Sequence, residues 1–163
     1  MRYIIIQFFY YKFKMNRFNV NVLAEAKQEY TQQLINLLYS HIYTGIKSIY
    51  DAANIFCKKT NDKNILKKFQ ILLSQIPKWN QDKINKEYHR ICSNSECDWI
   101  DELITAVFVS HAKVLSSIKN GKSSKTIDLD VPTAEYFLHK CYIESARNFW
   151  KKPYLLHNGF SNL

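Results

Sequence analysis

The stretch DWIDELITAVFVSHAKVLSSIK, residues 98–119, decides the fold class. Between Ala106 and Val109 it is apolar all round, which is typical of a helix buried on every side. Asp98 can cap its first turn, and the acids that follow suit the positive end of the helix dipole. We therefore expect a long helix over residues 98–119, at the centre of the fold. Its predicted stripe at helical spacing is Ile100, Leu103, Ile104, Val107, Phe108, His111, Val114, Leu115 and Ile118.

The region that follows predicts one extended segment and then a second long helix. Thr126–Val131 alternates apolar and polar residues like a half-buried strand, which we interpret as an extended strap or one arm of a small ribbon. Pro132 and Thr133 mark the start of the helix, and Glu144 and Arg147 can pair on its surface. Its predicted buried stripe is Tyr136, Phe137, Cys141, Ile143, Ala146 and Trp150.

Two further helices are expected earlier in the chain, either continuous or separated by a bend. The first covers Val22–Tyr39 and the second His41–Lys58, each with apolar residues at helical spacing. Gly45 is the weak point of the second helix, because glycine is a poor helix former. The predicted buried side chains are Leu23, Ala26, Tyr30, Leu34, Leu37, Leu38, Ile42, Ile46, Ile49, Ala53 and Phe56.

Two shorter helices are expected in the next stretch of the chain. Asn61 or Asp62 caps the first, and Pro77 stops it. Asn80 caps the second, which ends before the polar break Ser93–Ser95. Their predicted buried side chains are Ile65, Leu66, Phe69, Leu72, Leu73, Ile76, Ile84, Tyr88 and Ile91.

Composition supports a helical protein with one core. The chain has 163 residues, of which 47% are hydrophobic and 15% aromatic, too many for a disordered chain. Three glycines and three prolines favour long uninterrupted elements over many short strands. We predict a mainly α fold: a single-domain helical bundle of five to seven helices over residues 15–163, with one short extended or β segment. Residues 1–14 are predicted to be a separate N-terminal apolar extension.

The extension MRYIIIQFFYYKFK, residues 1–14, has three interpretations. It is an upstream in-frame extension that the cell does not make, a short strand or apolar arm of the domain, or a membrane-surface anchor. Its apolar run is too short to cross a bilayer, which needs about 20 residues, and it lacks a signal-peptide cleavage site. Met15 follows directly, which favours the first interpretation.

The net charge of +9 is only partial evidence for an anionic partner. Lysine supplies 19 of the 23 basic residues, whereas arginine is the residue that binds phosphates and base edges through paired hydrogen bonds. The richness in Lys, Ile, Asn, Tyr and Phe also fits an A+T-rich genome, so codon usage accounts for part of the charge. The stretch from Lys58 to Arg90 holds nine basic and three acidic residues with interleaved aromatics, as in proteins that bind single strands. The candidate nucleic-acid contacts are Lys58, Lys59, Lys67, Lys68, Lys78, Trp79, Lys83, Lys86 and Arg90.

Histidines and cysteines form two groups that suggest a metal hypothesis. A zinc site needs four nitrogen or sulfur ligands in a tetrahedron, and neither group supplies four by itself. Free, buried thiols beside interfacial histidines are the expected interpretation. The candidate metal ligands are His89, Cys92 and Cys97 in the first group and His139 and Cys141 in the second.

No other pattern indicates catalysis. His111 fits a core histidine bonded to a carbonyl group better than a buried base. Asp128 and Asp130 offer too few ligands for a divalent cation, and Ser116 and Lys119 match Ser-x-x-Lys without its companion motifs. The chain contains no Walker loop, dinucleotide glycine motif, nucleophile elbow or HExxH motif. We therefore expect a protein that is not an enzyme and needs no cofactor.

Several short stretches have a distinctive order. They are IPKWNQD (76–82), CDWI (97–100) leading into TAVFVSH (105–111), HKCYIE (139–144) and FWKKPY (149–154). Together they resemble an uncharacterised protein family of nucleocytoplasmic large DNA viruses, the giant viruses, over about Val20 to Leu156. The resemblance implies synthesis in an infected cell and a location in the host cytoplasm or the virion. It implies no catalytic or binding residue, and it implies that this chain is a short form of longer family members.

These observations lead to two hypotheses about function. The first is a non-enzymatic viral protein with a structural or protein-interaction role, whose partners are other viral or host proteins. The alternative is a basic accessory protein that binds nucleic acid through the Lys58–Arg90 region.

Overall fold

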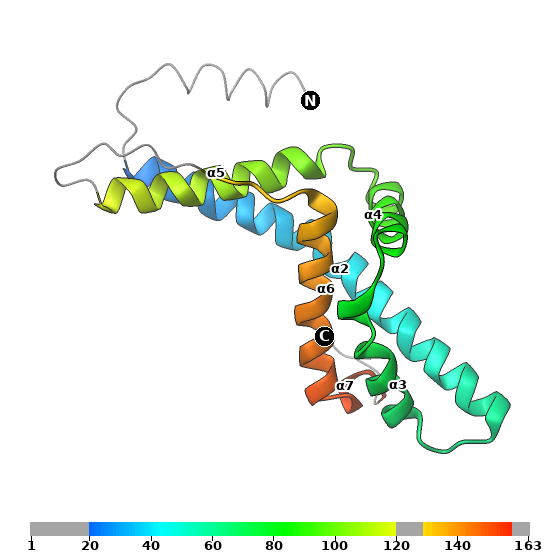
Figure 1. The fold of residues 1–163 in the computed structure, drawn as a ribbon. Helices are drawn as coiled ribbons and strands as arrows, with labels where there is room; N and C mark the ends of the chain where they lie inside the picture. Colours follow the sequence, from blue (N-terminus) through cyan, green and yellow to red (C-terminus); the bar gives the residue numbers. More distant parts are fainter. Residues whose placement is uncertain (1–19, 120–128, 158–163) are drawn as a thin grey trace. The chain divides into compact units, whose positions relative to one another are not determined.

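The fold is described from a computed structural model, which covers residues 20–119 and 129–157. Within those residues it contains six α-helices, one 3-10 helix and no β-strand (Figure 1), which confirms the predicted mainly α class. The α-helices are α2 (Val20–Thr60), α3 (Ile65–Leu73), α4 (Gln81–Ser95), α5 (Ile100–Lys119), α6 (Ala134–Lys151) and α7 (Tyr154–His157), and the 3-10 helix is η1 (Ile76–Lys78).

The contacts between residues divide the chain into two compact units. Unit 1 comprises residues 1–36 and 97–131, and unit 2 comprises residues 37–96 and 132–163. Helix α2 contributes to both units. The prediction of one domain over residues 15–163 stays a prediction, and the predicted extension, residues 1–14, lies outside the described residues.

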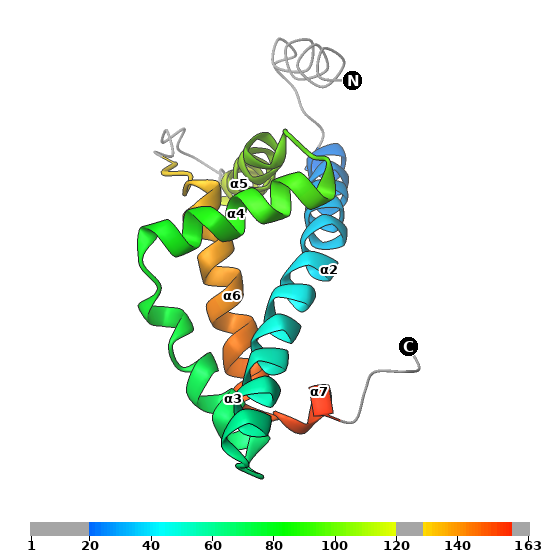
Figure 2. The same cartoon turned by 90° about the vertical axis from the view of Figure 1, so that its right-hand side faces the viewer.

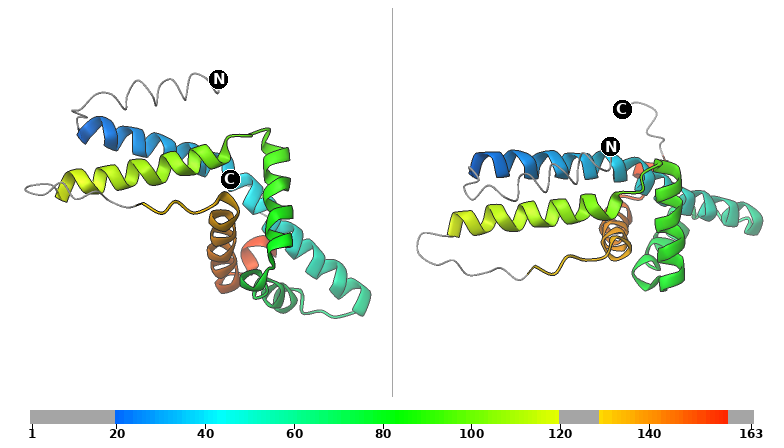
Figure 3. Two further views of the ribbon diagram at one scale, coloured as in Figure 1. Left: turned by 45° about the horizontal axis from the view of Figure 1, so that its top comes forward. Right: turned by 90° about the horizontal axis from the view of Figure 1, so that it is seen from above.

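In unit 1 the first part of α2 and helix α5 run side by side in opposite directions (Figure 3). A hydrogen bond of 3.3 Å joins Thr31 Oγ1 of α2 and His111 Nε2 of α5. The predicted apolar stripe of α5 is confirmed at Leu103 and Ile104, which are buried. Leu115 was expected on the same stripe but is exposed, so the buried stripe stops before it.

Helix α6 is the central helix of unit 2, where it contacts α3, α4 and η1 (Figure 2). Leu138 and Tyr142 of α6 are buried, as are Phe69 of α3, Ile76 of η1 and Ile91 of α4. The sequence placed the helix over residues 98–119 at the centre of the fold. In unit 2 the central helix is α6, because α5 is not part of this unit.

The buried face of α6 differs from the predicted one. Tyr136 and Trp150 were expected to be buried, but both are exposed. Their predicted burial was wrong because an aromatic side chain is compatible with either environment, and α6 has few aliphatic residues to define its inner face. The buried residues follow one another at intervals of four: Ala134, Leu138, Tyr142 and Ala146.

Helix α2 is one continuous helix of 41 residues, so the two predicted helices are joined without a break. Gly45 lies inside it and is buried. Near the C-terminal end of α2, Phe56 was predicted to be buried but is exposed, and Cys57 is buried in its place. The helix therefore presents Cys57, one residue further along, to the core.

One predicted N-cap, Asn80, is confirmed, and the predicted helix start near Thr133 proves to be a second side-chain cap. Asn80 Oδ1 accepts a hydrogen bond of 3.0 Å from the backbone N–H of Lys83 at the start of α4. Thr133 Oγ1 accepts one of 3.4 Å from the N–H of Tyr136 at the start of α6. Both satisfy first-turn donors that the helix itself leaves free. Helix α3 ends at Leu73 and Pro77 lies in η1, so α3 ends before this proline, as the sequence predicted.

Two other predicted caps lie elsewhere. Asp62 accepts a hydrogen bond of 2.9 Å from the N–H of Asn64 and so closes a turn before α3. At the start of α5, the N–H of Leu103 donates to the carbonyl oxygen of Trp99, which puts Trp99 rather than Asp98 at the first helical bond. Local hydrogen bonds thus moved each boundary by one or two residues.

Two further predictions concern the end of α4 and the extended segment before α6. Helix α4 continues through the predicted break and ends at Ser95, and its C-cap residue Glu96 has a left-handed backbone with φ of 50°. The first half of the predicted extended segment, residues 126–128, lies outside the described residues, and residues 129–131 have no regular secondary structure. No described helix combines the length and apolar character that crossing a membrane requires.

Candidate functional site

A cluster of polar groups lies where α2, α4 and α6 approach one another in unit 2. The Tyr142 hydroxyl donates a hydrogen bond to the Glu87 carboxylate. Arg90 donates to the same carboxylate oxygen from Nε at 2.9 Å and from Nη2 at 2.6 Å. Its Nη2 also donates to the carbonyl oxygen of His41 at 2.8 Å and to the Tyr142 hydroxyl at 3.2 Å. We name Gly45, Glu87, Arg90 and Tyr142 the Gly45 cluster.

Gly45 allows Tyr142 to reach α2. A Cβ atom at this position would lie 2.0 Å from the Tyr142 hydroxyl oxygen and 2.8 Å from Glu87 Oε1. Both distances are much shorter than van der Waals contact. Tyr142 is fully buried, so the packed side chains around it leave no space into which it could move. The close approach of the two helices therefore requires glycine here.

Two groups of the Gly45 cluster, Tyr142 and Arg90, keep one protonation state near neutral pH. Burial raises the pKa of Tyr142, and the Glu87 carboxylate raises it further, so the phenol stays neutral. The hydrogen bond with Glu87 raises the pKa of Arg90, so the guanidinium stays charged. No buried side-chain nitrogen or oxygen of the described residues lacks a hydrogen-bond partner. The cluster therefore joins helices and offers no free nucleophile.

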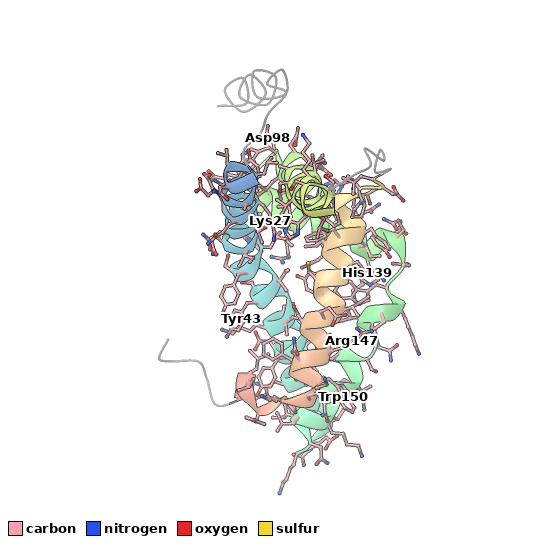
Figure 4. All side chains as sticks on the ribbon, turned by 90° about the vertical axis from the view of Figure 1, so that its left-hand side faces the viewer. Lys27, Tyr43, Asp98, His139, Arg147 and Trp150 are labelled. Atoms are coloured by element: carbon pink, nitrogen blue, oxygen red, sulfur yellow. The ribbon has the colours of Figure 1, made fainter. Side chains whose placement is uncertain are left out.

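His139 and Trp79 form a second contact, between α6 and the end of η1. His139 Nε2 donates a hydrogen bond of 2.8 Å to the carbonyl oxygen of Ile76. Its ring stacks on Trp79 with centroids 6.0 Å and planes 7° apart, and Trp79 also packs against Tyr142. Figure 4 shows His139 on α6, with Arg147 and Trp150 nearer the helix end. The contacts of His139 and Trp79 thus join α6 to η1 within unit 2.

The candidate nucleic-acid residues are distributed over four elements of unit 2. Arg90 is engaged in the Gly45 cluster, and the half-buried Trp79 packs against His139 and Tyr142. Lys68 Nζ lies 3.7 Å from the centroid of the Phe56 ring, and Lys83 Nζ lies 4.7 Å from that of the Trp79 ring. The hypothesis stays untested, but these contacts reduce it to the remaining lysines. They are Lys58 and Lys59 on α2, Lys67 on α3, Lys78 on η1, and Lys86 on α4.

The candidate metal ligands are not gathered into a site within the described residues. There, no three His, Cys, Asp or Glu side chains form a group that could hold a metal ion. None of the four cysteines is in a disulfide, His89 is exposed, and His139 is bonded to a carbonyl group. Burial raises the pKa of Cys141 to about 11, and a metal binds the thiolate rather than the thiol. Cys92 and Cys97 lie on either side of the boundary between the two units.

The thiol of Cys141 is expected to resist alkylation in the folded protein. A rise in its pKa from 9.0 to about 11 lowers the thiolate fraction near neutral pH roughly 100-fold. Iodoacetamide labelling followed by peptide mass spectrometry should show labelling of Cys141 at least about tenfold slower than in denaturant. Equal rates in the folded protein and in denaturant would contradict this expectation.

His111 connects α5 to α2 in unit 1. Thr31 Oγ1 donates its single proton to the carbonyl oxygen of Lys27 at 2.7 Å, so Nε2 of His111 is the donor in its bond to Thr31. Burial lowers the pKa of His111 below its usual 6.5, and the positive charge of Lys27 lowers it further. The sequence had assigned His111 to the core; it is half-buried, and its partner is a hydroxyl group rather than a carbonyl group.

The stability of unit 1 is expected to fall as the medium becomes acidic. The pKa of His111 is lower in the folded protein than in the unfolded chain. As the pH falls, His111 of the unfolded chain is therefore protonated first, near pH 6.5. The stabilisation is fully present above that pH and is lost as pH falls from 6.5 to the folded pKa. Urea unfolding at a series of pH values should show a smaller loss for His111→Gln than for the wild type. Lys27→Gln should reduce the loss only partly, since burial is the larger cause, and identical curves for all three proteins would contradict the expectation.

The Gly45 cluster was not predicted as a unit. Its sequence signals were a glycine inside a helix-forming stretch and a Glu–Arg pair three residues apart, Glu87 and Arg90. Tyr142 gave no such signal, because nothing local distinguishes it from the exposed Tyr136 on the same helix.

Comparison with known proteins identifies a family but no function. Searches of curated proteins and of solved structures each found no significant match. The profile of a family of unknown function, DUF5764, matches residues 20–157, which include every described helix. Because this match covers most of the chain, the protein belongs to the DUF5764 family.

Proposed function

We propose that this protein is a non-enzymatic structural or interaction protein that acts through contacts with other proteins and needs no cofactor. The resemblance of its motifs to a giant-virus family supports a viral protein of the host cytoplasm or the virion. The engagement of every group of the Gly45 cluster in holding helices together supports the non-enzymatic part.

One pair of apolar side chains carries this proposal. Ile35 and Tyr39 are one turn apart on α2, and they expose 53% and 72% of their surface. Single exposed apolar side chains are ordinary, but two on the same face of a helix form a stripe that a partner can cover. Tyrosine is also enriched among the residues that dominate binding energy at protein interfaces. Because both side chains are already partly covered, burying their remaining exposed surface would contribute about 1–2 kcal/mol each.

Photo-cross-linking in infected cells tests the proposal. A photo-reactive amino acid replaces Tyr39 and, as a matched control, Gln33, which is exposed on the opposite side of α2. Defined protein adducts at position 39 and a different or weaker set at position 33 are expected. Absence of protein adducts at position 39, or the same set at both positions, would overturn the role assigned to this stripe. Mass spectrometry of purified particles then tests whether the protein is part of the virion.

Nucleic-acid binding is the second candidate function, favoured by the exposed lysines on α2, α3 and α4. It predicts that the logarithm of the binding constant for DNA falls linearly with the logarithm of salt concentration, by about 0.9 per phosphate neutralised. A titration of a labelled duplex and a labelled single strand over a salt series measures this slope. A slope near zero removes the candidate.

A further inference from the structure

One end of unit 2 combines exposed apolar side chains with a high density of lysines. At this end, α3 contacts the C-terminal parts of α2 and α6 (Figures 1 and 2). Lys68 of α3 lies over the Phe56 ring of α2, 3.7 Å from its centroid. Gln70 of α3 donates a hydrogen bond of 2.8 Å to the carbonyl oxygen of Trp150 of α6. We name residues 55–72 and 150–156 the α3 end.

The apolar side chains of the α3 end are not needed to fill its core. Phe69 and Leu73 of α3 are buried and occupy the inner side of the helix. Outside them, five large apolar or aromatic side chains each expose about half of their surface. They are Ile55, Phe56, Ile71, Trp150 and Tyr154.

The charge of the α3 end is almost entirely of one sign. Its two segments contain seven lysines and one acidic residue, Asp62. The Asp62 carboxylate already accepts hydrogen bonds from the backbone N–H and side-chain amide of Asn64. The lysines are Lys58, Lys59, Lys63, Lys67, Lys68, Lys151 and Lys152.

We propose that the α3 end binds the surface of an anionic membrane. Lysines attract the negative charge of acidic lipids, and their long stems let the ammonium groups stay in water while apolar groups enter the interface. Tryptophan and tyrosine prefer that same boundary, and both are exposed here as Trp150 and Tyr154. The protein would then lie on the membrane through this end.

The choice of residues favours a membrane over the two other anionic partners. Protein interfaces are depleted in lysine and enriched in arginine, and nucleic-acid recognition relies on the arginine fork. Within the α3 end the basic residues are all lysine. The arginine nearest to it in the sequence, Arg147, is paired with Glu144. The inference does not depend on the proposed function, since it involves a different surface from Ile35 and Tyr39.

Co-sedimentation of the full chain with vesicles tests the inference. One set of vesicles is pure phosphatidylcholine and the other contains about 30% phosphatidylserine, at about 0.1 M salt. Binding to the anionic vesicles should be at least about tenfold stronger than to the neutral ones, and it should weaken strongly at about 0.5 M salt. Equal binding to both sets, or binding to neither, would overturn the proposal.

Two variants of equal net charge locate the binding surface. Lys67→Glu with Lys151→Glu reverses two charges at the α3 end, whereas Lys47→Glu with Lys86→Glu reverses two exposed lysines elsewhere in unit 2. The first should bind anionic vesicles at least about tenfold more weakly, and the second should stay within about threefold of the wild type. Circular dichroism confirms that both remain helical, and residues 1–14 are unchanged in both.

A third variant and a competitor complete the test. Ile71→Ser removes an exposed apolar side chain without changing charge, and it should weaken vesicle binding about threefold or more. Equal losses in both charge variants would overturn the proposal in favour of a general charge effect. Tighter binding to a thymidine oligonucleotide than to anionic vesicles, lost in the Lys67→Glu and Lys151→Glu variant, would overturn it in favour of nucleic acid.

Discussion

Replacing Gly45 with alanine is expected to destabilise the protein by about 2–4 kcal/mol, although alanine is the better helix former by about 1 kcal/mol. The new Cβ atom would lie 2.0 Å from the Tyr142 hydroxyl oxygen and 2.9 Å from Tyr142 Cζ. Tyr142 is fully buried, so it could move only by breaking its hydrogen bond to Glu87 or by separating α6 from α2. Overpacking and lost hydrogen bonds therefore outweigh the gain in helix propensity. Urea unfolding monitored by circular dichroism measures the difference.

A neighbouring substitution and a double-mutant cycle control this measurement. Thr44→Ala, at an exposed position of the same helix, should change the free energy of unfolding by less than about 0.5 kcal/mol. Tyr142→Phe removes the atom nearest to the new methyl group. Gly45→Ala should therefore cost at least about 1 kcal/mol less in that background than in the wild type. A stabilising effect of Gly45→Ala, or additive effects in the cycle, would contradict the close contact.

Replacing Arg90 with methionine is expected to cost about 2–3 kcal/mol. Methionine keeps much of the aliphatic volume but removes the bonds to Glu87, to the His41 carbonyl and to Tyr142. The Glu87 carboxylate then keeps only the Tyr142 hydroxyl as a partner within the cluster. The expected cost is below that of a fully buried pair, because the side chains of Arg90 and Glu87 are 28% and 20% exposed. Urea unfolding is again the measurement.

The second Glu–Arg pair provides a matched control for the first. Arg147 and Glu144 have the same spacing on α6, but both side chains are 64% exposed. Arg147→Met should therefore change stability by less than about 0.5 kcal/mol. Combining Arg90→Met with Glu87→Gln should recover part of the loss, since it removes the carboxylate left without its cation. Equal effects of Arg90→Met and Arg147→Met would show that burial does not distinguish the two pairs.

These stability effects decide how binding experiments with Arg90 are interpreted. The sequence offered Arg90 as a nucleic-acid contact, but its guanidinium makes four hydrogen bonds within unit 2. A loss of DNA binding in Arg90→Met would report a weakened fold as well as a lost charge. Lys67 and Lys86, both exposed, are better positions for that test.

Local patterns in the sequence were sufficient where the physics is local. Asn80 could be recognised as a cap because a short polar side chain satisfies backbone donors two or three residues away. The buried start of α5 could be recognised because its aliphatic residues are concentrated on one face. The pair Glu144–Arg147 followed from helical spacing alone.

The sequence by itself determined the helical class, most of the helices and several of their ends, because periodicity and capping depend on neighbours within one or two turns. Only the tertiary structure decided which tyrosine of α6 is buried, since Tyr136 and Tyr142 have similar intrinsic preferences. It also decided that Gly45 is a point of contact rather than a weak point, and that Arg90 holds helices together. Each of these outcomes depends on side chains about 50 to 100 residues away in the chain, and no local pattern carries that information.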